Sequence, residues 1–106
     1  MLRAAERAIE GARAVGDWGL EIRAVLLEAE AHKGLGDFAN ALQRVTWILT
    51  VAADPFRRED LVRSDVTSDV AMAHMVWVES ARFLPEIPAA KLLQVVEAGE
   101  AYLRAV

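Results

Sequence analysis

Apolar residues recur three or four positions apart along almost the whole chain, and strand signals are almost absent. This spacing places the apolar side chains on one face of a helix, where they can pack against another element. The apolar stripes predict five helices with short connections, near residues 2–15, 18–34, 38–52, 66–84 and 88–103. We therefore expect an all-α fold.

The breaks between the stripes carry residues that end helices. Gly16 and Gly34 end the first two stripes, and Asp54 ends the third, because the residue before Pro55 is pushed out of the α region. Residues 56–69 are the most polar part of the chain and form its longest connection. Two alternatives stay open there: one long helix, or a short helix followed by a break.

Composition adds a second expectation, because the chain holds more apolar material than its length readily buries. Hydrophobic residues make up 55% of the 106, and the mean hydropathy is +0.21. A single domain of this length has one core with few interior positions. We expect part of the surface to be covered by a second copy, by a partner protein or by the rest of a longer chain.

Charge and cysteine content argue against several classes of function. The net charge is −4 and the basic residues are scattered, which is unlike a nucleic-acid interface. There is no cysteine, which excludes a disulfide framework and a thiolate metal site. The first residues are amphipathic rather than a secretory signal, and the longest uncharged apolar run, 70–78, is too short to span a bilayer. We expect a cytoplasmic protein that contacts neither nucleic acid nor membrane directly.

Candidate catalytic and metal-binding residues are few. His32 and His74 are the only histidines, and neither has a partner at a ligand-like spacing. The sequence contains no phosphate-binding loop, zinc-binding helix motif or nucleophile turn. We expect a protein that is not an enzyme and that carries no cofactor or metal.

The connection between the second and third expected helices carries the most informative motif. Ala29 lies seven positions before Gly36, Asp37 and Phe38 follow that glycine, and Ala41 comes three after the aromatic residue. Small side chains let antiparallel helices approach closely, and glycine permits a tight reversal between them. The pattern resembles a tetratricopeptide repeat and is similar to the repeats of bacterial multi-repeat transcription activators.

The resemblance implies a right-handed stack of antiparallel helical hairpins in one domain, 1–106. Residues 1–15 would be the lone second helix of a repeat, 18–54 the best-preserved repeat and 66–105 a degenerate one. In the degenerate repeat, Pro85 stands where the motif has glycine. The resemblance is specific for stacked hairpins and does not by itself identify a function.

The same packing would bury Glu28 between helices, where the family has an apolar residue. A lone buried carboxylate is costly. We therefore expect Glu28 to pair with a basic side chain, either Arg44 or Lys33.

The resemblance also implies a function, which is protein–protein interaction as a scaffold module. In the family, the first helices of successive pairs line a groove that holds a peptide or a partner helix. Transferred to this chain, the groove residues are Arg23, Leu26, Glu30, Lys33, Met72, Met75, Glu79 and Arg82. The alternative is a regulatory or ligand-sensing segment of a larger bacterial protein, such as a transcription activator.

The expected helices at the two ends have no polar capping helix beside them, although stacked repeats need one to stay soluble. We expect a homodimer formed through one of these terminal helices, or a place within a larger chain. The candidate self-association residues are Leu2, Ile9, Leu92, Val96, Tyr102 and Leu103.

Overall fold

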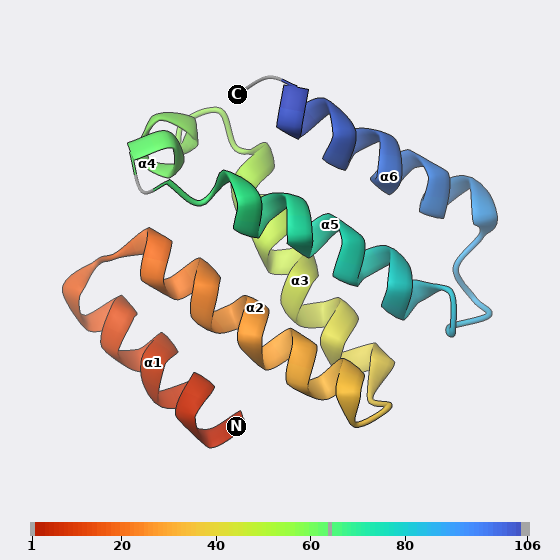
Figure 1. Ribbon diagram of the computed structural model, residues 1–106, viewed down its shortest axis with the longest axis horizontal. Coiled ribbons are helices and arrows are strands. Elements are labelled where there is room, and N and C mark those ends of the chain that lie inside the picture. Colours follow the sequence, from red (N-terminus) through yellow and green to blue (C-terminus); the bar gives the residue numbers. More distant parts are fainter. Residues whose placement is uncertain (1, 64, 105–106) are drawn as a thin grey trace.

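The computed structural model describes residues 2–63 and 65–104, which form six helices (Figure 1). Their bounds are α1 Leu2–Val15, α2 Trp18–Gly34, α3 Phe38–Ala53, α4 Arg58–Arg63, α5 Thr67–Ala81 and α6 Ala89–Arg104. This part of the chain contains no strand, so the all-α class is confirmed. The five expected helices are present, with ends within three residues of the predicted ones.

The expected number of helices is corrected from five to six by α4, which lies within the polar connection 56–69. Leu61 is 1% exposed and anchors this short helix to the core. Asp65 has a φ of 52°, in the left-handed region, and this turn prevents α4 from continuing into α5. Of the two alternatives left open for the connection, the short helix followed by a break is the correct one.

The turns from α1 to α2 and from α2 to α3 have the same structure. Gly16 and Gly36 have φ values of +70° and +79°, which glycine adopts without strain. The next amide, of Asp17 or Asp37, donates to the carbonyl five residues earlier at 2.9 Å in both turns. Each aspartate then caps the following helix by accepting from the amide three residues later. A Gly-Asp pair therefore ends one helix and begins the next.

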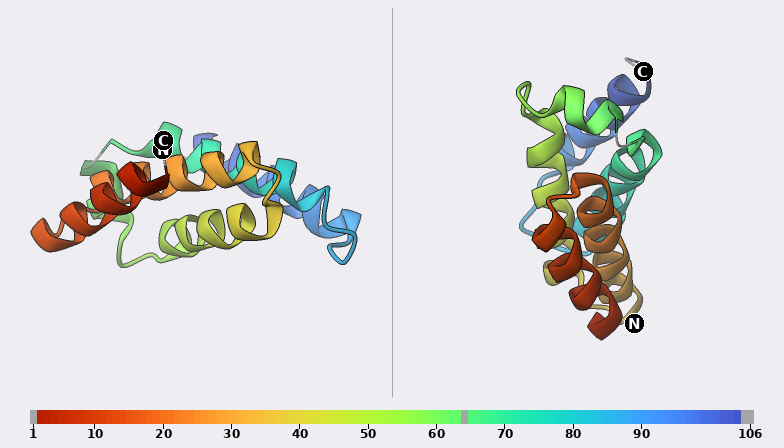
Figure 2. Two further views of the ribbon diagram at one scale, coloured as in Figure 1. Left: turned by 90° about the horizontal axis from the view of Figure 1, so that it is seen from below. Right: turned by 90° about the vertical axis from the view of Figure 1, so that its left-hand side faces the viewer.

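Helices that are consecutive in the chain pack together, apart from α4: α1 on α2, α2 on α3, α3 on α5, and α5 on α6. Figure 1 shows these neighbours running in opposite directions, whereas α2 and α5 lie side by side and run in the same direction. α3 lies on one side of the layer formed by α2 and α5 (Figure 2, left). The domain is flat, with extents of 38 × 33 × 17 Å.

The core is centred on α2, α3 and α5. The largest fully buried apolar side chains come from these helices and from the segment between α3 and α5: Ile22, Val45, Ile48, Leu61, Val66, Val70 and Val76. Among the described side chains of α1, those that face α2 are buried, which are Ala5, Ile9 and Ala12. α6 contributes Val95 alone among the buried apolar side chains of the described residues. Burial thus falls off from the central helices toward α1 and α6.

Candidate functional site

Two interhelical ion pairs join α2 to α5 on their solvent side. Arg23 Nε lies 3.2 Å from Asp69 Oδ2, and Lys33 pairs with Glu79. Both pairs join residues that are 46 positions apart in the sequence, so the two parallel helices stay in register between them. Solvent-facing pairs of this kind add little stability, but they fix which residues lie next to one another.

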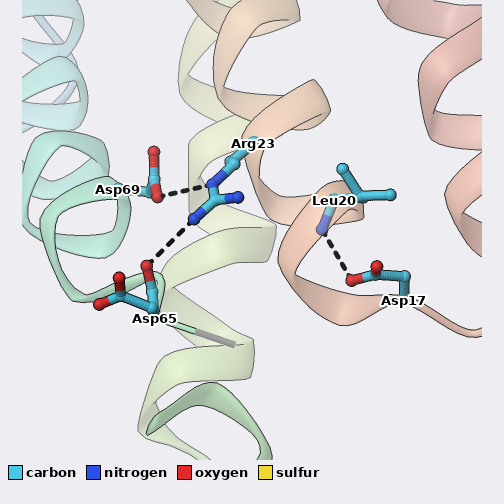
Figure 3. Close-up of polar contacts among 5 residues, drawn as sticks. All are labelled: Asp17, Leu20, Arg23, Asp65 and Asp69. Carbon is cyan, nitrogen blue, oxygen red and sulfur yellow. Dashed lines mark hydrogen bonds and ion pairs between the residues drawn. The ribbon is translucent and has the colours of Figure 1, made fainter. Parts of the chain in front are cut away.

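Arg23 makes a second contact, which fixes the start of α5. Its Nη2 donates to the carbonyl of Asp65 at 3.1 Å, in the left-handed turn before α5 (Figure 3). The guanidinium thus binds both the turn and Asp69, which lies in the first turn of α5. Val66 at the N-cap position provides no side-chain hydrogen bond, so Arg23 supplies the polar anchoring of this helix end.

Exposed apolar side chains lie between the two ion pairs along both helices. Leu27 on α2 is 47% exposed, and Met72 and Met75 on α5 are 48% and 47% exposed. Leu20, at 51%, extends the same stripe toward the start of α2. We call this surface the α2–α5 face: Leu20, Arg23, Leu27, Glu30, Lys33, Met72, Met75, Glu79 and Arg82. It brings seven of the eight expected groove residues to one surface.

The eighth groove residue, Leu26, is a correction. It is 7% exposed and belongs to the core, so it is not offered to a partner. The outward residue is its neighbour Leu27, which the sequence reasoning missed. The signal was present, because Arg23, Leu27 and Glu30 follow the i, i+4, i+7 spacing of one helix face. Which of two adjacent leucines is buried and which is exposed depends on where the neighbouring helix packs, and the sequence does not show this.

One end of the α2–α5 face is closed by an aromatic pair. Phe38, at the start of α3, stacks on Phe83 after α5, with ring centroids 4.4 Å apart. Arg82 lies over the Phe83 ring at 4.9 Å. Phe83 is 53% exposed, and Leu35, at the C-cap of α2, is 73% exposed. This end of the face is therefore also apolar, with one cation on it.

The side of the molecule that holds α3 carries two cavities. One lies between α1 and α3, has a volume of about 360 Å³ and reaches Glu28 on α2. The other lies between α3 and α6, has a volume of about 500 Å³ and reaches His74 on α5. Each cavity forms where two helices pack on a third without closing the space between them.

Glu28 has the partner expected from the sequence. Its side chain is 4% exposed and forms an ion pair with Arg44 of α3. Lys33, the other candidate, pairs with Glu79 instead. Oε1 of Glu28 accepts no hydrogen bond from the described residues, so the ion pair with Arg44 is the contact that compensates the buried charge.

The two histidines lie in separate environments. His32 Nδ1 is 3.4 Å from Asp37 Oδ2 at the turn between α2 and α3. The pKa of Asp37 is lowered, chiefly because the side-chain amide of Asn40 donates to its carboxylate, and the charge of His32 adds to this effect. His74 Nδ1 lies 2.7 Å from the carbonyl of Val70. Across the described residues there is no group of three or more His, Asp or Glu side chains that could hold a metal ion.

The candidate self-association residues do not form one surface. Ile9 is 8% exposed and packs in the core, so it is not available to a second copy. On α6, Leu103 is 53% exposed, and Leu92, Val96 and Tyr102 are half-buried. The side chain of Leu2 lies outside the described part of the structure. Leu93, which the sequence reasoning left out, is 59% exposed on α6.

None of the helices in the described residues is both long enough and apolar enough to cross a bilayer. Comparison of the chain with models of protein families, with curated proteins and with solved structures found no match.

Proposed function

We propose that this chain is a protein-interaction module that binds an amphipathic segment of a partner along the α2–α5 face. The observation that carries the proposal is the exposed apolar stripe of Leu27, Met72 and Met75 between two interhelical ion pairs. The ion pairs neutralise Arg23 and Lys33 within the chain, so the partner is recognised mainly by apolar side chains. Methionine side chains adapt their shape and suit such a surface.

The helix arrangement supports the finer fold proposal of a right-handed stack of tetratricopeptide-like hairpins. In such a stack the first helices of successive hairpins run parallel and line one surface. α2 and α5 run parallel, and each is followed by an antiparallel second helix, α3 or α6 (Figure 1). The repeated Gly-Asp turns are the local structure that such tight hairpins need.

The test is selection of peptides from a random library on the immobilised chain, followed by binding measurements on variants. Leu27→Glu and Met75→Glu place a charge in the apolar stripe and should each weaken binding of the selected peptides at least tenfold. The matched control is Val15→Glu, which places the same charge at an exposed apolar residue at the end of α1 and should leave binding unchanged. Peptides that bind both stripe variants as well as the original chain would overturn the proposal.

Self-association through α6 is a second proposal, supported by the exposure of Leu93 and Leu103. Light scattering should give twice the chain mass of 11.6 kDa at tens of micromolar. Leu103→Glu should shift the protein toward the single-chain mass, because the charge would be buried in the interface. A mass of 11.6 kDa for the unchanged protein would exclude the dimer.

The alternative role, a regulatory or ligand-sensing segment of a larger bacterial protein, is supported by the two cavities beside α3. A DNA-binding or ATPase domain in the same reading frame would favour this role over the scaffold.

A further inference from the structure

Small side chains form part of the walls of the cavity between α3 and α6, beside the larger Leu49, Pro55 and Tyr102. Ala52 and Ala53 line it from α3, and Ala98 and Ala101 line it from α6. Both helices pack on α5, and its residue His74 lies at the base of the cavity. The small walls leave a space of about 500 Å³, within the range of small-molecule sites.

Gly99 explains why the space stays open beside a close helix crossing. A Cβ at this position would lie 2.9 Å from the Cβ of His74, so only glycine lets α6 approach α5 here. α6 is therefore held against α5 at Gly99, while its alanines face α3 across the cavity. The shape of the cavity follows from this crossing and not from a loop.

His74 supplies a polar atom to this mainly apolar space. The residue is 7% exposed, and its Nδ1 lies 2.7 Å from the Val70 carbonyl. A carbonyl oxygen only accepts, so Nδ1 carries a proton, and in the neutral form of the ring Nε2 keeps its lone pair. Nε2 has no hydrogen-bond partner among the residues that the structure describes. The cavity thus offers one acceptor that is not engaged by the protein.

Asp54 is the charged residue that lines the cavity, and its carboxylate already interacts with residues that follow it in the chain. Asp54 accepts from the Phe56 amide at 2.9 Å and pairs with Arg57 at 3.3 Å. It therefore offers little attraction to a cationic ligand.

We propose that this cavity binds a small neutral ligand with a planar apolar body and one hydrogen-bond donor, of the phenol or indole class, and that the donor binds Nε2 of His74. The site lies on the α3 side of α5, so the proposal does not depend on partner binding at the α2–α5 face.

The test compares indole with 1-methylindole, which has a similar shape and lacks the N–H donor. Amide chemical shifts of the ¹⁵N-labelled chain are followed as either compound is added. Indole should move the amides of α3, α5 and α6 around the cavity, with a Kd on the order of 0.1–1 mM for a ligand of this size. Methylation should weaken binding about tenfold, because the hydrogen bond to Nε2 is then lost.

Two α6 variants locate the site without touching the core. Ala101→Phe fills the cavity and should abolish binding of indole. Ala90→Phe makes the same change at an exposed alanine that does not line the cavity, and should leave binding intact. His74→Phe keeps a ring but removes the acceptor, and should bind indole and 1-methylindole equally.

Equal binding of the two compounds by the unchanged protein would overturn the assigned role of His74. Binding of indole that survives Ala101→Phe, or no binding of either compound, would overturn the site itself.

Discussion

The hairpins α2–α3 and α5–α6 have the same arrangement of helices but very different burial. α3 packs against both α2 and α5, and its residues Val45 and Ile48 are fully buried. α6 packs against α5, and its residues Leu93 and Leu103 are more than half exposed. Both helices are apolar in sequence. The helices that pack against it, and not its apolar content, therefore decide how much of each helix is buried.

The largest expected effect comes from removing a core side chain in each hairpin. Ile48→Ala in α3 should lower the free energy of unfolding by about 3–4 kcal/mol, because both flanking helices lose contacts around the cavity left behind. Leu92→Ala in the half-buried stripe of α6 should cost only about 1 kcal/mol. Urea unfolding monitored by circular dichroism measures both. Equal losses would contradict the unequal burial of the two hairpins.

The buried ion pair is a feature of the first hairpin, and removing its cation gives the next largest effect. Arg44→Ala leaves the Glu28 carboxylate buried without its partner and should cost about 2 kcal/mol. The loss stays below that of a fully buried pair because the Arg44 side chain is 48% exposed. In a Glu28→Gln background the same change should cost little. A loss that is identical in both backgrounds would show that Arg44 stabilises by packing alone.

The Gly-Asp turn also distinguishes the hairpins, since the connection from α5 to α6 contains prolines in place of glycine. Gly36→Ala places a Cβ at a φ of +79° and should cost about 1–2 kcal/mol. Gly34→Ala, two residues earlier in the helix and with space for a Cβ, should be neutral or stabilise by up to about 1 kcal/mol. Thermal unfolding of the pair of variants tests this. If Gly36→Ala unfolds at the same temperature as the unchanged protein, the left-handed conformation at residue 36 does not contribute to stability.

The smallest effect concerns the cap of α3. The Asn40 hydrogen bond lowers the pKa of Asp37 from its ordinary 3.8, so Asn40→Ala should raise that pKa toward this value. Asp37 has a lower pKa folded than unfolded, so its contribution to stability is present above pH 3.8 and is lost as the pH falls through the folded pKa. The variant should therefore lose stability near neutral pH and differ least from the original chain in acid.

Titration of the Asp37 carboxyl carbon by NMR measures this shift directly. Gln43→Ala, on the same helix but outside the hydrogen bond, is the control and should leave the titration unchanged. An unchanged Asp37 titration in the Asn40 variant would show that another group holds the pKa down.

The positions of the long helices could be predicted from the sequence because each apolar stripe is interrupted by a residue that physically ends a helix. Gly16, Gly34 and Asp54 with Pro55 all lie at helix ends in the structure. The sequence could not decide between the two alternatives for residues 56–69, so α4 could not be predicted. Its six residues are too few to form a stable helix alone, and it exists because Leu61 is buried against the core.

The positions of the expected groove residues could be predicted in part, because residues that share a helix face follow from spacing. Seven of the eight lie on the α2–α5 face, and their role in binding stays a prediction. Leu26 and Leu27 could not be told apart, since their exposure depends on where α5 packs. The cavity at His74 was not predicted, because it forms between three helices that are distant in the sequence.

The sequence by itself determined the helical class, the places where the long helices end, and the Gly-Asp turns, because these depend on backbone sterics and on spacing within one element. Together with the repeat resemblance, which implied that Glu28 is buried, it also indicated that Glu28 would need a cation, because a lone buried charge is costly. Tertiary structure alone decided that Arg44 is that cation, that Leu27 faces outward, and that a cavity opens over His74. Each of these depends on how whole helices pack, and packing is decided by all of their contacts together.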